Sequence, residues 1–162
     1  MKNLILMRHA KSSWNHPSLS DRQRPLNKRG KRDALRMGEF LEKQGIEIDA
    51  ILCSSAQRTQ ETLSLFLEEF TFEHEAEFLD KLYHADLRDY IDELEKLPTE
   101  TENAMIIGHN PTISEALDFF CDEYEPFPTA AIAHIAFEID EWHNLIKNPN
   151  GKLLGYWYPK GI

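Results

Sequence analysis

An arginine and a histidine stand side by side directly after the first apolar segment of the chain. Arg8 and His9 follow Leu4–Met7. An arginine binds phosphate oxygens with a planar fork of N–H donors, and a neutral imidazole is a nucleophile toward phosphorus. Because α/β sheets bind their ligands at the carboxyl ends of the strands, this pair points to a site that handles a phosphoryl group.

Two later segments repeat this arrangement of chemically active residues after a short apolar run. Arg58 comes five residues after Ala50–Cys53, in the expected first turn of a helix, and His109 comes directly after Ala104–Gly108. The loops after parallel strands converge on one edge of a sheet. Helix N-termini at that edge add free N–H groups and a favourable dipole for an anion. The sequence therefore predicts a phosphate pocket that contains a nucleophile.

The chemistry of each residue type assigns the roles within this pocket. His9 is the expected nucleophile, which forms a phosphohistidine intermediate and splits the transfer into two steps. Arg8 and Arg58 are expected to hold the non-bridging oxygens. His109, if protonated, supplies a third cationic donor, and Asn15 is expected to donate its side-chain amide to the same oxygens. None of these roles needs a metal ion or another cofactor.

The segments around these residues alternate between expected strands and expected helices. The strands are Leu4–Met7, Ala50–Cys53, a weaker one near Glu75–Phe78, Ala104–Gly108, Ile132–Phe137 and Leu153–Tyr158. The helices are Asn27–Gln44 with Gly45 as its C-cap, Ala56–Phe70 with Ser54 or Ser55 as N-cap, Leu87–Leu97, and one from Pro111 to about Phe120. This alternation predicts an α/β fold, a three-layer α/β/α sandwich with a mostly parallel sheet. The polar stretch Pro17–Pro25 is expected to be a surface loop near the mouth of the site.

Length and composition describe one ordinary globular domain over residues 1–162. The chain is 41% hydrophobic and 28% charged, which is typical of such domains. No apolar run approaches the ~20 residues of a membrane span, and no signal peptide is expected. A cytoplasmic protein without a membrane partner is therefore predicted. Cys53 and Cys121 do not suggest a disulfide framework.

The charge is unevenly distributed along the chain. The formal net charge of −10 argues against nucleic acid as a partner, because nucleic-acid binding needs a basic surface. Residues 1–36 carry ten Lys or Arg and two acidic residues, a formal charge of +8, so the remaining 126 residues carry −18. Either the basic segment steers an anionic substrate toward Arg8, or it forms a solvated helix face that pairs with acidic groups.

Several motifs together resemble the histidine phosphatase superfamily, and most closely its short SixA-type phosphohistidine phosphatases. The motifs are Arg8-His9 with Ser12 and Trp14-Asn15, then Arg24-Pro25-Leu26-Asn27-Lys28-Arg29-Gly30, Ser54–Thr62, Leu82-Tyr83-His84-Ala85 and Gly108-His109-Asn110-Pro111. The resemblance implies a phosphoglycerate mutase-like fold. It also implies a His9 nucleophile, with phosphate bound by Arg8, Arg58, His109 and Asn15.

Two positions depart from the family pattern. Ala10 stands where the family usually has glycine, so we expect an ordinary backbone conformation there. The family's glutamate proton donor falls near Lys81, with Asp80, His84 and Asp86 as the neighbouring candidates. Alkoxide leaving groups need a proton from the enzyme, whereas the leaving nitrogen of a phosphoramidate is protonated more easily. This departure favours phosphohistidine as the substrate.

Other readings of the sequence remain open at this stage. A thiolate phosphatase would use Cys53, but four residues rather than five separate it from Arg58. Metal motifs such as His-Glu-x-x-His and the P-loop motif are absent. The partner is expected to be a phosphorylated protein or a small phosphorylated molecule, and a binding module that lacks turnover is the non-enzymatic alternative. The oligomeric state cannot be read from the sequence.

Overall fold

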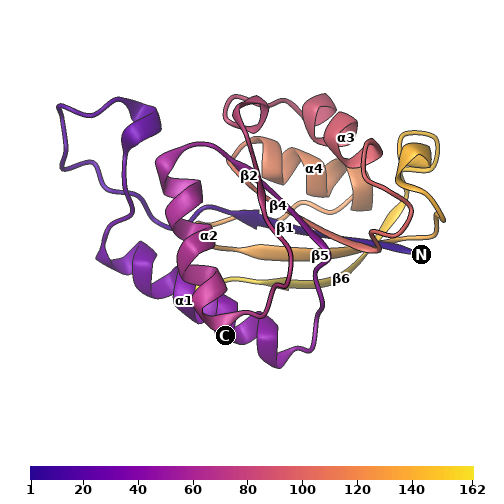
Figure 1. Cartoon of the computed structure of the whole chain (residues 1–162), viewed down its shortest axis with the longest axis horizontal. Coiled ribbons are helices and arrows are strands. Elements are labelled where there is room, and N and C mark those ends of the chain that lie inside the picture. Colours follow the sequence, from indigo (N-terminus) through magenta and orange to yellow (C-terminus); the bar gives the residue numbers. More distant parts are fainter.

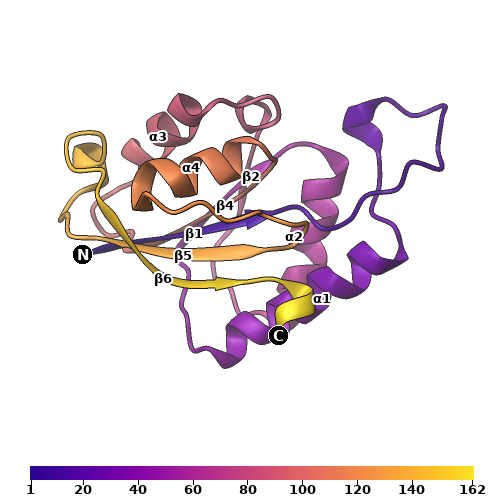
Figure 2. The ribbon, with the colours of Figure 1, turned by 180° about the vertical axis from the view of Figure 1, so that it is seen from behind.

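A mixed sheet of six strands forms the centre of the computed structural model, which describes residues 1–162 (Figures 1 and 2). The strands are β1 (Lys2–Arg8), β2 (Ala50–Ser54), β3 (Glu77–Leu79), β4 (Asn103–Gly108), β5 (Ile132–Phe137) and β6 (Gly151–Trp157), in the spatial order β3-β2-β4-β1-β5-β6. Each lies at an expected position, with ends shifted by at most two residues. The exact extents differ because the ladder with a neighbouring strand, rather than the apolar run, decides where a strand ends.

The strands that carry the predicted site residues are neighbours in the sheet. β2 pairs with β4 and β4 pairs with β1, both in parallel, and β3 extends this parallel set. β5 runs antiparallel to both β1 and β6. The carboxyl ends of β1, β2 and β4 therefore meet at one edge, and the loops after them lie together there.

Helices cover both faces of the sheet, which gives the predicted three-layer sandwich. Helices α1 (Lys28–Lys43) and α2 (Gln57–Glu69) cover one face, and α3 (Leu87–Glu95) and α4 (Thr112–Cys121) cover the other (Figures 1 and 2). Successive side chains of a strand point to opposite faces. Accordingly, Ile5 and Met7 of β1 belong to the core beneath α1 and α2, whereas Leu4 and Leu6 belong to the core beneath α3 and α4.

Two of the expected helix starts are wrong in detail. Ala56 occupies the N-cap position of α2 and makes no side-chain cap bond. Ser54 Oγ instead accepts from the backbone N–H of Ala56, and Ser55 Oγ donates to Asp80. Pro111 is the N-cap of α4 rather than its first helical residue. Both serines are thus used by the loops beside the site, which sequence pattern alone does not reveal.

The connection from β1 to α1 is a loop closed at its base. Ser12 and Leu26 form an isolated antiparallel bridge, and the backbone N–H of Ser13 donates to Pro25 O at 2.8 Å. We call residues 13–25 the strap. Its exposed part includes the short 3-10 helix η1 (Asp21–Gln23), and it extends away from the sheet at one end of the molecule (Figure 1). The surface loop expected at Pro17–Pro25 is therefore present.

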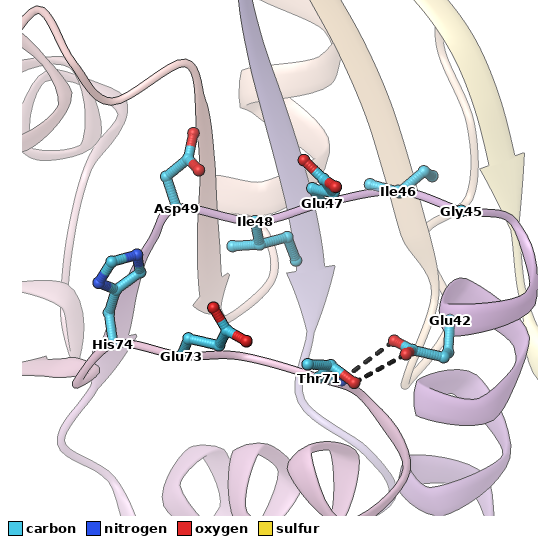
Figure 3. Close-up of a pocket in the computed structure, with 9 residues that line it drawn as sticks. All are labelled: Glu42, Gly45, Ile46, Glu47, Ile48, Asp49, Thr71, Glu73 and His74. Carbon is cyan, nitrogen blue, oxygen red and sulfur yellow. Dashed lines mark hydrogen bonds between the residues drawn. The ribbon is translucent and has the colours of Figure 1, made fainter.

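A separate, acidic cavity lies at the other end of the strands from the loops that follow β1, β2 and β4. It has a volume of about 430 Å³ and lies beside residues 45–49, which lead into β2 (Figure 3). Among its lining residues are Glu42, Glu47, Asp49 and Glu73. Such a cavity does not suit a phosphate, because its carboxylates repel anions.

None of the helices in the structure has the length and apolar character that crossing a lipid bilayer requires.

Gly30 allows α1 to lie against the segment that follows β1. A Cβ atom at Gly30 would lie 2.1 Å from Lys11 O, so Gly30→Ala must push this backbone away. We expect the variant to lose about 1–3 kcal/mol of unfolding free energy in urea titrations. Lys31→Ala, an exposed neighbour in the same helix, should change it by less than about 0.5 kcal/mol. Equal stability of the two variants would contradict the close approach.

Candidate active site

The loops after β1, β2 and β4 enclose a polar cavity of about 360 Å³. It is lined by Arg8, His9, Lys11, Ser12, Trp14, Arg24, Arg58, Tyr83, His84, His109, Asn110 and Thr129. Four of the five predicted site residues are therefore brought together. The fifth, Asn15, is not: it is exposed, does not line the cavity, and its backbone N–H donates to Ser13 Oγ. It is displaced because the chain leaves the cavity at this point to form the strap.

His9 is held in one tautomer with a free ring nitrogen. Its side chain is buried, and Nδ1 lies 2.7 Å from Ala10 O. A carbonyl oxygen only accepts, so Nδ1 carries the hydrogen and Nε2 keeps its lone pair. Burial, which outweighs the bond to Ala10, lowers the pKa of His9 to about 3. The imidazole is therefore neutral at neutral pH, as a nucleophile must be.

The backbone beneath His9 is fixed from several directions. His9 N–H donates to Gly108 O of β4, and Ala130 N–H bonds the carbonyls of Arg8 and His9. Ala10 N–H donates to Thr62 Oγ1 of α2 at 3.0 Å. Ala10 has no positive φ, unlike Asp122 and Ala130, so the expectation of an ordinary backbone at this position is confirmed.

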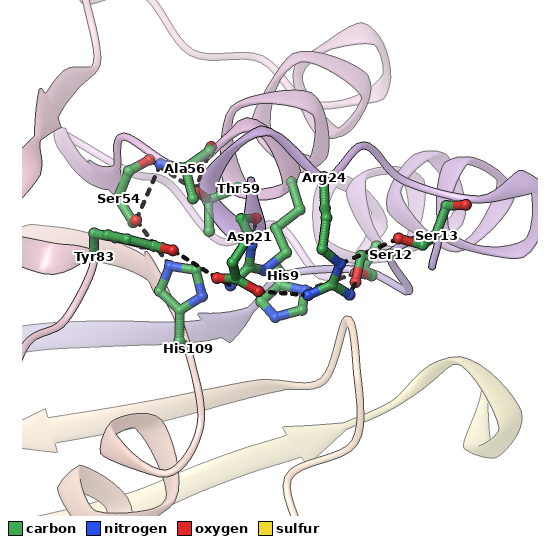
Figure 4. A network of polar contacts seen from close by, with 12 residues as sticks. His9, Ser12, Ser13, Asp21, Arg24, Ser54, Ala56, Thr59, Tyr83 and His109 are labelled. Carbon is green, nitrogen blue, oxygen red and sulfur yellow. Dashed lines mark hydrogen bonds and ion pairs between the residues drawn. The ribbon is translucent and has the colours of Figure 1, made fainter. Parts of the chain in front are cut away.

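His109 faces His9 across the cavity, with the two ring centroids 5.2 Å apart. Ser54 Oγ lies 2.8 Å from His109 Nε2 (Figure 4), whereas Nδ1 is buried without a hydrogen-bond partner in the protein. Burial lowers the pKa of His109 to about 4, with a further contribution from Arg58. In the free protein His109 is therefore neutral at pH 7, and it becomes a cationic donor only when an anion beside it raises this pKa.

Arg8 and Arg58, two of the three arginines that line the cavity, are each fixed by one residue and keep a donor unused. Arg8 Nη1 donates to Phe127 O at 3.0 Å, while its Nε is buried without a partner. Both terminal nitrogens of Arg58 donate to Asp21, Nη1 to the backbone O at 2.8 Å and Nη2 to Oδ2 at 3.1 Å. The Nε of Arg58 makes no hydrogen bond within the protein. Unused guanidinium donors at the wall of one cavity suit an oxyanion.

Asp21 of the strap is a site residue that the sequence analysis did not identify. Its Oδ1 accepts from Arg24 Nη1 at 2.9 Å, and its Oδ2 accepts from Tyr83 OH at 2.5 Å as well as from Arg58 (Figure 4). The bond from Tyr83 is the main reason that the pKa of Asp21 lies well below its usual range. One signal was available in the sequence, because Asp21 and Asp33 are the two acidic residues in the basic segment 1–36.

Arg24 and Arg22 join the strap to the rest of the site. Arg24 is buried, bonds Ser12 Oγ, donates from Nε to Ser13 O at 3.2 Å, and stacks on Trp14 with its Cζ 3.3 Å from the ring centroid. Arg22 bonds both Ser55 Oγ and Asp80 at the ends of β2 and β3. The strap is thus attached to the cavity rim by Arg24 and Arg22, and Asp21 adds the bonds to Arg58 and Tyr83.

We expect Asp21→Ala to lower kcat/KM for phosphoryl substrates by about ten-fold, because Arg58 loses the partner that orients it. Affinity for inorganic sulfate, measured calorimetrically, should fall in parallel. Asp80→Ala is the control, since it removes a strap contact that does not involve Arg58. If Asp21→Ala binds sulfate more tightly than the wild type, Asp21 competes with the anion instead of positioning its ligand.

The four candidates for a proton donor have different surroundings in the structure. Asp80 accepts from Ser55 and Arg22, and these bonds keep its pKa below the usual range. Lys81 pairs with Glu93, and Asp86 caps α3. Of the four candidates, only His84 lines the cavity. No Asp or Glu side chain lines it, so no carboxylic acid is placed to protonate a leaving group.

The position of Cys53 does not support the thiolate alternative. Cys53 is fully buried in the core beneath α1 and α2, and burial raises the pKa of its thiol. A buried thiol of high pKa is a poor nucleophile, and Cys53 does not line the cavity. No group of three or more His, Cys, Asp or Glu side chains is arranged to hold a metal ion.

Part of the chain matches a known protein family, and about two thirds of it resembles a protein of Mycobacterium leprae. A family model described as the histidine phosphatase superfamily (branch 1) matches residues 4–105. An uncharacterized protein of Mycobacterium leprae is 35% identical over 67% of this chain and 66% of its own length, so the chain spans slightly less than two thirds of that relative.

Two solved structures resemble the whole chain. The protein histidine phosphatase SixA complexed with tungstate has a TM-score of 0.83 and 25% identity, over 98% of this chain and 97% of that chain. A candidate phosphohistidine phosphatase SixA from Agrobacterium tumefaciens has a TM-score of 0.84 and 25% identity, over 98% of each chain. The family match includes Arg8, His9 and Arg58 but ends before His109. The structural likeness extends over the remainder.

Proposed function

Because the chain belongs to the histidine phosphatase superfamily, branch 1, we propose that residues 1–162 form one phosphatase domain that hydrolyses phosphohistidine in a signalling or phosphotransfer protein. The observation that carries this proposal is the composition of the cavity. It combines a neutral His9 with a free Nε2, three arginines and no carboxylic acid. The likeness to SixA structures supports the same substrate class.

The reaction follows from this geometry in two displacement steps. In the first, Nε2 of His9 attacks phosphorus and the P–N bond of the substrate breaks. The electron pair stays on the substrate imidazole, which takes a proton from solvent or from His84. In the second, water attacks phospho-His9, the new P–N bond breaks, and inorganic phosphate leaves. Arg8 and Arg58 hold the non-bridging oxygens in both steps, and His109 bonds the same oxygens once it is protonated.

The absence of a carboxylic acid from the cavity wall favours a nitrogen leaving group. An alkoxide leaving from a phosphomonoester must be protonated as the P–O bond breaks, and a positioned acid contributes about 10²–10⁴-fold to such steps. When the P–N bond of phosphohistidine breaks, one proton on the substrate ring is enough for it to leave as a neutral imidazole. The site is therefore better suited to phosphohistidine than to phosphoserine or to a sugar phosphate.

A turnover panel tests this proposal. Phosphohistidine in a peptide should be hydrolysed with a kcat/KM at least about 10²-fold above that for phosphoserine, phosphotyrosine or a sugar phosphate. The activity should persist in excess chelator, since no proposed step needs a metal. Preferred turnover of a sugar phosphate would identify a metabolite phosphatase instead. Tight binding of the phosphopeptide without turnover would identify a binding module.

The depressed pKa of His109 predicts that anion binding takes up a proton. In the free protein this pKa is about 4, and a bound dianion raises it, so the anion binds more tightly as the pH falls. Sulfate, which stays a dianion over this range, should bind about ten-fold more tightly at pH 5 than at pH 7. His109→Gln should remove most of this dependence. An unchanged pH profile in that variant would assign the proton to another group.

A further inference from the structure

A second cavity with cationic walls lies next to the candidate active site. It has a volume of about 300 Å³, and we call it the arginine cavity. Its lining residues are Arg29, Arg32, Asp33, Arg36, Pro128, Thr129, Tyr158, Pro159 and Lys160. The three arginines stand on successive turns of α1, whereas Tyr158, Pro159 and Lys160 come from the end of β6 and the 3-10 helix η4 (Pro159–Gly161). Figure 2 shows this C-terminal segment beside α1.

Two of the four cationic side chains in the arginine cavity have no partner within the protein. Arg29 pairs with the buried Asp33, with 3.6 Å between Arg29 Nε and Asp33 Oδ2. Arg36 Nη2 donates to an oxygen of Ile162, the last residue of the sequence, at 2.6 Å. Arg32 and Lys160 make no ion pair or side-chain hydrogen bond within the protein. Four cationic side chains thus share one side-chain carboxylate and one oxygen of Ile162, which leaves the excess positive charge at Arg32 and Lys160.

The arginine cavity adjoins the active-site cavity. Thr129 lines both of them, and Arg29 Nη2 lies 3.5 Å from Thr129 Oγ1. Lys11, another cation of the basic segment, lines the active-site side. A ligand whose phosphoryl group lies at His9 would therefore find a second group of cationic donors just beyond Thr129.

We propose that the arginine cavity binds a carboxylate side chain of the phosphorylated protein, close to its phosphohistidine. This proposal rests on the proposed function and deepens it. Arginine forks bind carboxylates bidentately, and the ring of Tyr158 with Pro128 and Pro159 gives the cavity apolar walls for the aliphatic part of an acidic side chain. Residues 37–162 carry a formal charge of −18, so an acidic partner is repelled from most of the chain and attracted to this end.

The test compares two phosphohistidine peptides that differ only in flanking residues, glutamate in one and glutamine in the other. Wild-type protein should show about ten-fold higher kcat/KM for the glutamate peptide, and this preference should shrink at high salt. Arg32→Gln with Arg36→Gln should abolish the preference without changing turnover of phosphoramidate, a small substrate. Lys43→Gln with Arg88→Gln makes the same change in net charge elsewhere and should retain the preference.

A binding measurement separates failure of this inference from failure of the proposed function. An unphosphorylated glutamate-rich peptide, titrated into ¹⁵N-labelled protein, should shift the amide signals around Arg32, Arg36 and Tyr158. If no phosphoramidate is turned over but these signals shift, the proposed function fails and the carboxylate site stands. Equal turnover of both peptides, or shifts that persist in the Arg32→Gln/Arg36→Gln variant, would overturn the carboxylate site.

Discussion

Replacing His9 with alanine is expected to abolish turnover of phosphohistidine, with a loss in kcat of at least about 10⁴-fold. The variant loses the one ring nitrogen in the cavity that combines a lone pair, a fixed tautomer and a neutral state at pH 7. His109 cannot replace it, because Ser54 holds its Nε2 and its other nitrogen is buried. The remaining arginines should still bind sulfate with an affinity within about three-fold of the wild type.

The intermediate gives this prediction a second, independent readout. Wild-type protein quenched during turnover of a labelled phosphodonor should carry phosphate that is stable in base and labile in acid, and His9→Ala should carry none. His74→Ala is the matched control, since His74 is an exposed histidine in the acidic cavity at the other edge of the sheet. Activity in His9→Ala equal to that of the wild type would refute the nucleophile.

Replacing Arg58 with alanine should lower kcat/KM by about 10²–10³-fold and weaken sulfate binding. Two effects combine in this variant. The cavity loses a guanidinium, and the Asp21 carboxylate loses its partner and then repels the incoming anion. Removal of both side chains in Asp21→Ala/Arg58→Ala should therefore cost less than the product of the two single losses.

Arg58→Lys should recover no more than about ten-fold of that loss. Arg58 uses Nη1 and Nη2 for Asp21 and keeps Nε for a ligand, and a single ammonium group cannot serve two anions with such a planar fork. Steady-state kinetics on Asp21→Ala, Arg58→Ala, the double variant and Arg58→Lys check this, with Arg88→Ala as a distant surface control. Additive effects of the Asp21 and Arg58 substitutions would show that the two residues act independently.

The strands and the layers of the fold were predictable because their residues are apolar and their spacing is simple. β1 is apolar at every position from Leu4 to Met7, which predicts a strand covered on both faces. Its side chains accordingly alternate between the two cores. The loops with Arg8-His9, Arg58 and His109 were predictable as neighbours because parallel strands end at one edge. The orders of strands and the antiparallel direction of β5 depend on long-range pairing, which local pattern does not encode.

The details that escaped prediction depend on contacts between distant segments. Asn15 follows the site motif in sequence, but the chain leaves the cavity after Trp14, whose ring stacks on Arg24, so Asn15 is exposed. Asp21 has no motif of its own, and its role depends on Arg58, which is 37 residues away. Ser54 resembles a helix cap in sequence, yet its hydroxyl also bonds His109. Asp21 and Ser54 each bond a local partner and also a residue far away in the sequence.

The closed base of the strap makes this segment exchangeable. Its ends, Ser13 and Pro25, are bonded to each other, so its length and composition can change without moving β1 or α1. A strap grafted from another protein could therefore alter which molecules reach His9 while the fold stays intact. The graft would have to bring its own carboxylate, because Arg58 depends on Asp21 to stay in place. A replacement of the strap is therefore expected to change access to His9 and the orientation of Arg58 at the same time.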